Sequence, residues 1–243
     1  MSVRLRNQQH DAEVSIIIGG NNAILDASGA LFLTCENLLI VSDLHLEKGT
    51  SGARRGLFLP PYDSRLTLAA LAGALAKYRP VGIVFLGDSF HDQHGPFRLP
   101  ANELDAIKSM SQACELIWIT GNHDPQLPGF LPGSVHCELN IAGLQLTHIP
   151  GRKLDPVSQI SGHLHPVAFA YGHGRAIRRR CFITDGKRLI MPAFGAYTGG
   201  LNIKDKAFHG LFDTDALDVY LLGKTQVYPM PTAALSRSNL SGK

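Results

Sequence analysis

Residues 38–45 read LLIVSDLH: an unbroken apolar run, 38–41, is followed by the polar residues Ser42, Asp43 and His45. The same pattern occurs twice more, in VGIVFLGDSFHD at residues 81–92 and in ELIWITGNHD at residues 115–124. A short continuous apolar run is typical of a strand that is buried on both faces of its sheet. We therefore expect three buried strands, each followed directly by a polar cluster.

Helical patterns separate these three predicted strands. Leucines recur at near-helical spacing within Ser64–Tyr78, and Pro80 ends that pattern. Ala101–Ala113 is a second predicted helix, preceded by Pro100. The order strand–helix–strand–helix–strand indicates an α/β fold with parallel neighbouring strands. Ligands of open α/β sheets bind beyond the carboxyl ends of the strands, so the three polar clusters are expected at one edge.

The flanking segments are rich in predicted strands. Upstream we expect a strand at Val14–Ile18, a turn at Gly19–Asn22, and a hairpin formed by Leu31–Thr34 and Leu38–Ser42. After Gly121 the helix signal is weak and the predicted strands are Val135–Leu139, Leu144–His148, Gln159–His163, Ala176–Thr184, Arg188–Pro192 and Ala216–Leu222. The second half therefore predicts a second sheet packed on the first. We expect a single domain over residues 1–231 and a polar C-terminal tail over residues 232–243.

Length and composition narrow the class of protein. With 243 residues, 44% hydrophobic and 18% charged, the chain is typical of a folded domain and not of a disordered one. The sequence contains no apolar run near the roughly 18 residues that span a bilayer, and its start lacks the pattern of a signal peptide. Four widely spaced cysteines without zinc or redox spacing favour buried free thiols in a reducing cytoplasm. The net charge of +3 permits a polyanionic partner without establishing one.

The polar clusters contain the side chains that bind divalent metal ions. Asp43 and His45 lie two residues apart, as do His163 and His165, and on extended backbone such residues point to the same side. The candidate ligands are carboxylate, amide and imidazole groups, namely Asp43, His45, Asp88, Asn122, His148, His163 and His165. Without thiolates, this set suits Mn²⁺, Fe or Zn²⁺. Seven ligands with one bridging carboxylate fit two metal ions about 3.5–4 Å apart.

Each short motif also has a plain structural explanation. An aspartate after a strand is commonly a turn or helix cap, Gly-Asp is commonly a turn, and two histidines in a strand are often a surface pair. However, all of the motifs occur in order here, and the first three each follow an apolar strand. Coincidence is therefore a poor explanation of the set.

The ordered set DLH, GDSFHD, GNHD, a single histidine and GHLH resembles the calcineurin-like metallophosphoesterase superfamily over residues 38–166. The resemblance implies a four-layer αββα sandwich of two mixed sheets with a dinuclear metal centre. It implies a first metal held by Asp43, His45, Asp88 and His165, and a second held by Asp88, Asn122, His148 and His163. Asp88 bridges the two ions in this scheme. His123 matches the catalytic histidine of the family, and Asp124 is either the residue that orients its ring or a simple turn carboxylate.

Two positions depart from the common pattern of the superfamily. Many members have GDxxD, whereas here the last position is His91. This GDxFH form is similar to the double-strand-break repair nucleases, in which the histidine helps to place the scissile phosphate. The other departure is at His148, which is followed by Ile149 where the family often has glycine.

A narrower resemblance covers nearly the whole chain. The segments DLHLEKG, LPPYDS, GDSFHD and RRRCFITDGKRLIMPAFGAYTGGLN are similar to the ligase-associated DNA damage response endonuclease family, called PdeM. This implies a bacterial, cytoplasmic, Mn²⁺-dependent phosphodiesterase or endonuclease in DNA repair, with DNA as substrate and a DNA ligase, an exonuclease and a helicase as functional associates. Arg54 and Arg55 follow the first motif and are candidates for binding substrate phosphates.

Two other functions fit parts of the sequence. The first is a phosphoesterase for small nucleotide-type molecules on the same fold, and the second is a non-catalytic metal-binding scaffold. A scaffold has no need of a general acid such as His123, which is why hydrolysis is the favoured hypothesis.

Overall fold

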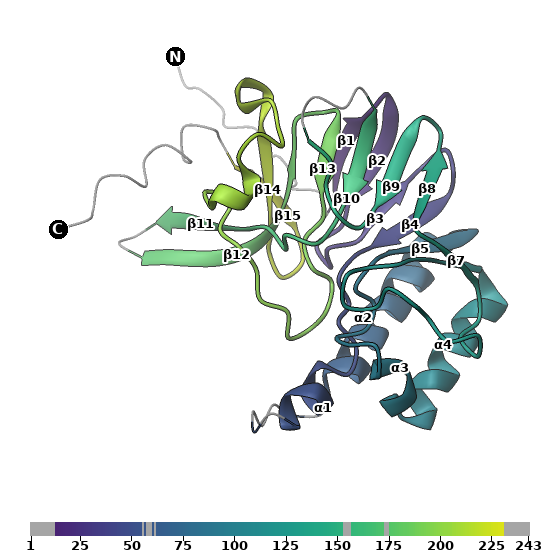
Figure 1. Ribbon diagram of the computed structural model, residues 1–243. Helices are drawn as coiled ribbons and strands as arrows, with labels where there is room; N and C mark the ends of the chain where they lie inside the picture. The colour runs from purple at the N-terminus through teal and green to yellow at the C-terminus, as the bar shows by residue number, and fades with distance from the viewer. Residues whose placement is uncertain are drawn as a thin grey trace, which may run out of the picture.

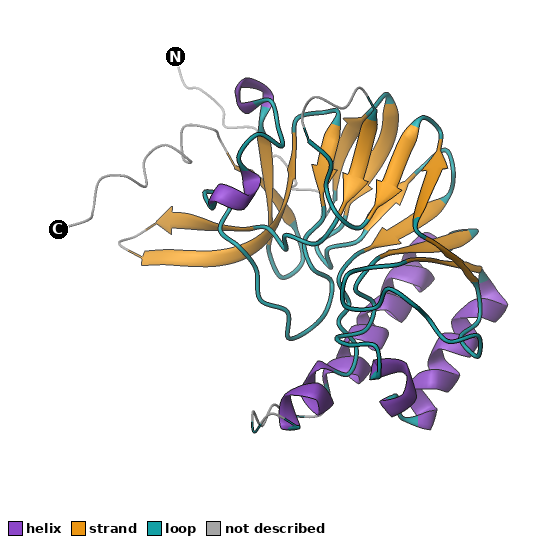
Figure 2. Ribbon diagram, in the orientation of Figure 1, coloured by secondary structure: helices purple, strands orange, loops and turns teal. Residues whose placement is uncertain are grey.

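The computed structural model describes residues 13–54, 56, 60, 62–152, 157–172 and 175–230. Two mixed sheets lie face to face, and helices cover the outer face of the first sheet (Figures 1 and 2). The predicted sandwich of two mixed sheets is confirmed. Within the described residues, no helix combines the length and the apolar character needed to cross a membrane.

The first sheet contains seven strands in sequence order. They are β1 (Val14–Ile18), β2 (Asn21–Leu25), β3 (Leu31–Leu33), β4 (Leu38–Val41), β5 (Gly82–Leu86), β6 (Glu115–Ile119) and β7 (Ser134–His136). The strands from β1 to β4 are antiparallel, and those from β4 to β7 are parallel. The parallel part therefore brings the ends of β4, β5 and β6 to one edge, as the sequence predicts.

The three central strands are buried on both faces. In β4, Leu38 and Ile40 pack into the core between the sheets, whereas Leu39 and Val41 pack under the helices. Successive residues of a strand point to opposite faces, so a strand between two apolar layers must be apolar throughout. The outer layer consists mainly of two helices, α2 (Asp63–Tyr78) and α4 (Ala101–Ala113).

Two short helices lie in the loops that follow β4 and β5. They are α1 (Lys48–Ala53) and α3 (Gly95–Arg98), which have no apolar period in the sequence and were not predicted. Figure 1 shows both below the sheets, near the N-terminal end of α2.

The second sheet contains eight strands and comes from the second half of the chain. They are β8 (Glu138–Ile141), β9 (Leu144–Thr147), β10 (Ser158–Ser161), β11 (Val167–Gly172), β12 (Arg175–Thr184), β13 (Arg188–Ile190), β14 (Asp218–Leu222) and β15 (Val227–Met230). Their order is β15-β14-β12-β13-β10-β9-β8, and β11 pairs with β12 in a hairpin that extends away from the sheet (Figure 1). Strands β9, β10 and β13 are parallel, so the loops after β9 and β10 emerge at the same edge.

The outer face of the second sheet has its own apolar cluster. Phe208 and Phe212 pack there against Ile183 and Ile190. The segment that covers this face contains the 3₁₀ turns Lys206–Phe208 and Thr214–Ala216. The fourth layer of the sandwich is thus a folded loop on this side and not a pair of long helices.

Several predicted boundaries are corrected by the structure. The single strand expected at Val135–Leu139 is two strands, β7 and β8, which belong to different sheets. The turn expected at Gly19–Asn22 ends at Gly20, because β2 begins at Asn21. All four cysteines are free thiols, but only Cys114 and Cys181 are buried, so the expectation of burial is wrong for Cys35 and Cys137.

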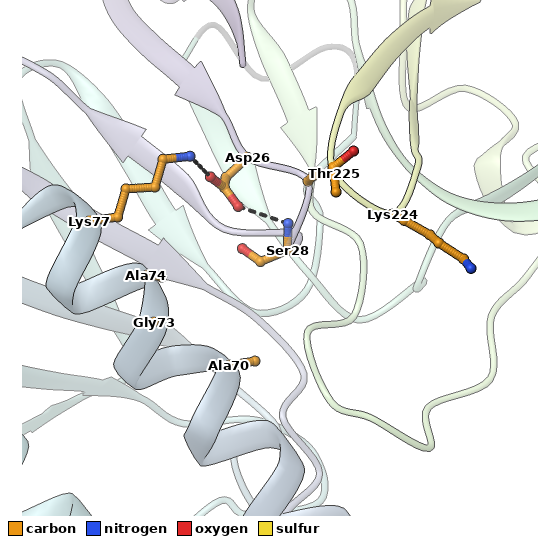
Figure 3. A pocket seen from close by; sticks show the side chains of 9 residues that line it. Asp26, Ser28, Ala70, Gly73, Ala74, Lys77, Lys224 and Thr225 are labelled. Carbon is orange, nitrogen blue, oxygen red and sulfur yellow. Dashed lines mark hydrogen bonds and ion pairs between the residues drawn. The ribbon is translucent and has the colours of Figure 1, made fainter. Parts of the chain in front are cut away.

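Helix α2 is attached to the turn after β2 by a charged cluster (Figure 3). The Lys77 ammonium forms an ion pair with the Asp26 carboxylate, and the Tyr78 hydroxyl donates a 2.7 Å hydrogen bond to Asp26 Oδ2. The Ser28 backbone N–H donates to Asp26 Oδ1 at 2.8 Å. Beside this cluster, small residues of α2 line a pocket of about 370 Å³.

Candidate metal centre

The polar clusters of both sheets meet at the edge where the parallel strands end. The loops after β4, β5 and β6 carry Asp43, Asp88 and Asn122, and the loops after β9 and β10 carry His148 and His163. Three groups of three ligand atoms result, and in each group all atoms lie within 4.8 Å of one another. Two of the groups contain only predicted metal ligands, and the third consists of His45, His91 and His123. Metal–ligand bonds of about 2.1 Å place the ligands of one ion at nearly this spacing.

The first group consists of Asp43, His45 and His165. His165 Nε2 lies 3.0 Å from Asp43 Oδ1 and 3.3 Å from His45 Nε2. Asp43 is fully buried and His45 nearly so. Burial of charged and polar groups is costly unless they are paired or bind a metal, so this convergence of a carboxylate and two imidazoles fits a cation.

The second group consists of Asp88, His148 and His163. His148 Nε2 lies 3.3 Å from Asp88 Oδ2, 3.3 Å from His163 Nδ1 and 3.0 Å from the amide oxygen of Asn122. The other ring nitrogen, Nδ1, donates to the backbone carbonyl of Leu86 at 3.0 Å. When the ring is neutral, this bond holds its proton on Nδ1 and makes Nε2 the ligand atom, an arrangement found in metal-binding histidines.

Asp88 lies between the two groups. Its Oδ2 atom is 3.3 Å from His148 Nε2 in the second group and 3.8 Å from His45 Nε2 in the first. Its Oδ1 atom accepts a 2.8 Å hydrogen bond from the backbone N–H of His123. One carboxylate thus faces both groups, as a bridging ligand must.

The backbone that presents these ligands is not extended. Asp43, His45, His163 and His165 have φ values of 54°, 46°, 70° and 45°, in the left-handed region. The expected extended backbone is therefore wrong for both pairs, although Asp43 and His45 still join one group, as predicted. His163 and His165 instead diverge, and each joins a different group. Such strained conformations are concentrated at functional sites.

Two glycines make room for the site. A Cβ atom at Gly87, where φ is +79°, would lie 2.4 Å from the ring of His148. A Cβ atom at Gly162 would lie 1.9 Å from Ser42 Oγ and 2.6 Å from Asp43 Oδ2. The glycines of the GD and GH motifs are therefore required by the close approach of a ligand side chain.

The electrostatics of the cluster keep both carboxylates ionised. Burial raises the pKa of Asp43, but the hydrogen bond and charge of His165 outweigh it and hold the pKa below its usual value. For Asp88, burial is likewise outweighed by His148, and the pKa falls to about 2. Burial lowers the pKa of His45 to about 3, so its ring is neutral. The two carboxylates and His45 are therefore in the protonation states that bind a cation. Burial lowers the pKa of His148, but its hydrogen bond to Asp88 and the charges of Asp43 and Asp88 outweigh burial and raise the pKa to about 8, so a cation at the second group would have to displace the proton of His148.

His123 lies beside the two groups and is more exposed. Its Nδ1 atom donates to the backbone carbonyl of His91 at 2.8 Å, and its Nε2 atom lies 4.0 Å from Asp88 Oδ2. The rings of His91 and His123 stack with centroids 5.4 Å apart, and both lie within metal-ligand spacing of His45. The carbonyl of His91 thus orients the ring of His123.

Asp124 does not orient the ring of His123, which was one of the two roles expected of it. Its carboxylate is fully buried and accepts hydrogen bonds from the backbone N–H groups of Gly121, Asp88 and Phe90, at 2.9, 3.1 and 3.1 Å. Burial raises its pKa to about 6. Asp124 therefore connects the loop after β6 to the loop after β5.

The structure describes one of the two substrate-binding candidates. Arg54 is exposed at the end of α1, and Arg55 lies outside the described residues. Arg180 in β12 donates a hydrogen bond to the carbonyl of Ala193 and is partly buried.

Two residues that shape the site were not predicted. Ser42 directly precedes Asp43 and donates a 2.6 Å hydrogen bond to Asp43 Oδ2. Arg98 binds both oxygens of Asp92 at 2.8 Å and donates to Thr50 Oγ1 at 3.0 Å, which joins the loops after β5 and β4. Arg98 lies outside the sequence motifs, so the sequence did not indicate its role. Ser42 directly precedes Asp43, and this adjacency was visible in the sequence.

The donor set suits a dinuclear metal site, and the comparisons with known proteins agree with it. The family model described as calcineurin-like phosphoesterase matches residues 37–187, and the chain belongs to this family. It is a hydrolase that acts on phosphoester bonds. None of the curated proteins matches the chain.

Among solved structures, the nuclease MPE of Pseudomonas putida is similar over nearly the whole chain. It is 26% identical, with a TM-score of 0.71, over 90% of this chain and 100% of the nuclease. A phosphoesterase of E. coli, Yfce, is 16% identical over 80% of this chain and 92% of its own, with a TM-score of 0.40.

Proposed function

We propose that the chain is a dinuclear-metal-dependent phosphodiesterase that cleaves DNA as an endonuclease. The observation that carries this proposal is the position of Asp88, whose Oδ2 atom faces His148 Nε2 at 3.3 Å and His45 Nε2 at 3.8 Å. A shared carboxylate between two ligand groups is the arrangement that two-metal hydrolysis requires.

The first ion would be held by Asp43, His45, Asp88 and His165, and the second by Asp88, Asn122, His148 and His163. Two divalent cations supply Lewis-acid charge to the phosphoryl oxygens and lower the pKa of an attacking water. We propose Mn²⁺ as the metal, because oxygen and imidazole donors without thiolate suit it; Fe and Zn²⁺ fit the same donors.

His123 is proposed as the general acid. Its Nδ1–H is already engaged by the His91 carbonyl, so Nε2 is the nitrogen that faces the cluster. A protonated ring held in this way can deliver the Nε2 proton to the leaving oxygen, on which charge develops as the ester bond breaks. His91 holds the ring through its carbonyl and is proposed to contact a phosphate oxygen through its own ring.

DNA as the substrate is supported by the likeness to a nuclease over 90% of this chain. Arg54 and Arg55 are proposed to bind substrate phosphates. A role in bacterial DNA repair in the cytoplasm, beside a DNA ligase, an exonuclease and a helicase, extends the proposal and rests on the sequence motifs alone.

The test compares turnover by the metal-reconstituted protein on single-stranded DNA, cyclic nucleotides and bis-p-nitrophenyl phosphate. We expect Mn²⁺-dependent cleavage of DNA within the strand. Turnover of cyclic nucleotides without cleavage of DNA would favour a small-molecule phosphoesterase, and inactivity with every metal would favour a scaffold.

A variant series tests the general acid. His123→Ala is expected to lose at least about a hundredfold in kcat while its metal content is retained. The matched control is His209→Ala, which removes an exposed histidine outside the cluster. Loss of metal together with activity in His123→Ala would contradict the proposed role.

A further inference from the structure

A pocket of about 280 Å³ lies beside the candidate metal centre and has no part in the mechanism above. Two loops and helix α3 form its walls, and the lining residues are Gln93, His94, Phe97, Gln126, Leu127 and Pro128. Gln93 and His94 follow His91 in the loop after β5, whereas the other loop follows β6 and His123.

The two loops that line the pocket also carry His91 and His123. His123 Nδ1 donates to the His91 carbonyl at 2.8 Å, which holds the two loops together at the cluster. Successive Cα atoms are about 3.8 Å apart, so Gln93 lies within about 8 Å of His91, and Gln126 within about 12 Å of His123. The pocket is therefore close to His91 and to His123, which is the proposed donor of the proton to the leaving group.

The pocket presents aromatic surface to solvent. Phe97 is 68% exposed and Phe130 is 45% exposed, and their rings meet edge to face with centroids 5.5 Å apart. The neighbouring Pro96 and Gly95 of α3 are buried, so the helix is anchored by these residues and leaves Phe97 outward. An exposed aromatic pair beside a catalytic centre is a surface for stacking.

Besides Phe97, Leu127 and Pro128, the pocket is lined by three polar side chains and by no carboxylate. Gln93 and Gln126 are exposed amides that both donate and accept hydrogen bonds, and His94 is an exposed imidazole. An aromatic face together with amide and imidazole groups matches a nucleobase, which has a flat π face and an edge of donors and acceptors.

We propose that this pocket binds the base of the nucleotide on the leaving-group side of the scissile bond, with Phe97 as its stacking platform. The inference rests on the proposed function, because it needs a nucleic-acid substrate. Phe97 is thus a substrate-positioning residue that holds the strand while the cluster acts on the phosphate.

The test uses single-stranded oligonucleotides of one sequence in which a single residue is replaced by a tetrahydrofuran abasic residue. We expect the wild-type protein to lose about tenfold in kcat/KM when the abasic residue follows the scissile bond on the leaving-group side. Phe97→Ala should show about the same loss on intact DNA, mainly through KM, and should no longer respond to the abasic residue. Phe97→Trp should restore both values.

Tyr228→Ala is the matched control, because it removes a 44% exposed aromatic side chain from β15 and should keep the response to the abasic residue. If the wild-type protein cleaves DNA but ignores the abasic residue, or if Phe97→Ala responds as strongly as the wild type, the pocket inference is overturned and the proposed function stands. If bis-p-nitrophenyl phosphate is hydrolysed but no DNA is cleaved, the DNA substrate and this inference both fail.

Discussion

The Ser42 hydroxyl donates a 2.6 Å hydrogen bond to Oδ2 of Asp43, and both residues are fully buried. The same carboxylate oxygen accepts the backbone N–H of His163 at 3.0 Å. These two donors leave Oδ1 facing His165 Nε2 at 3.0 Å. Ser42 therefore determines which oxygen of Asp43 is directed at the first ligand group.

Removal of this hydroxyl is expected to weaken metal binding at the first group. Ser42→Ala should reduce Mn²⁺ affinity about tenfold, as loss of a hydrogen bond to a metal ligand commonly does. Isothermal titration of chelator-treated protein with MnCl₂ measures this. The matched control is Ser89→Ala, because Ser89 is equally buried, follows Asp88, and has a hydroxyl without a hydrogen-bond partner among the described residues. Equal affinities of the two variants would show that the bond from Ser42 has no effect.

The glycine of the GD motif gives a second prediction. Gly87→Ala combines a positive φ with a Cβ atom 2.4 Å from the ring of His148, which must then move. We expect destabilisation of about 3 kcal/mol or more and loss of metal from the second group. Urea unfolding and metal content by mass spectrometry are the measurements.

Gly186→Ala separates backbone strain from the steric clash. Gly186 has a similar φ of +82°, but no described atom lies within 4 Å of the position that its Cβ atom would take. This variant should lose only about 1 kcal/mol and retain its metal. A Gly87→Ala protein as stable and as metal-loaded as Gly186→Ala would contradict the argument.

The Asp26 cluster on α2 predicts a pH dependence of stability. Burial raises the pKa of Asp26, but hydrogen bonds from Lys77, Ser28 and Tyr78 outweigh it and lower the pKa to about 2. The carboxyl group of an aspartate in an unfolded chain has a pKa of about 3.9. A depressed pKa stabilises the fold above pH about 4, and this contribution is lost as the pH falls toward about 2.

Asp26→Asn should therefore reduce the free energy of unfolding by about 1–2 kcal/mol at neutral pH, with a deficit that shrinks between pH about 4 and about 2. Chemical unfolding of chelator-treated protein across this range measures the deficit. Asp105→Asn removes an exposed carboxylate that lies 3.6 Å from Lys108, and should change stability by less than about 0.5 kcal/mol throughout. A deficit for Asp26→Asn that grows as the pH falls would have the wrong sign.

Sequence patterns predicted the central architecture because few other folds satisfy them. Strands β4, β5 and β6 are apolar at every position that faces a core, and α4 begins and ends at the predicted residues. Asp43, His45, Asp88 and Asn122 were anticipated because they directly follow these strands. Patterns failed where tertiary pairing decides the structure, as at residues 134–141, where neighbouring segments join different sheets.

The backbone conformation of the paired ligands also could not be predicted from a local sequence pattern. A spacing of two residues predicts a common side only on extended backbone. His163 and His165 have positive φ values because their loop is fitted around Asp43, to which the His163 N–H is bonded. Arg98 and the Phe97 pocket likewise depend on α3, a four-residue helix without a periodic signal.

The central claim is that Asp88 joins two metal ions held by residues from both sheets. Anomalous diffraction at the manganese edge, on crystals of the protein loaded with Mn²⁺, tests this most directly. The account predicts two peaks about 3.5–4 Å apart, one beside Asp43 and His165 and one beside His148 and His163, with Asp88 contacting both. A single peak, or two peaks that do not share Asp88, would contradict it.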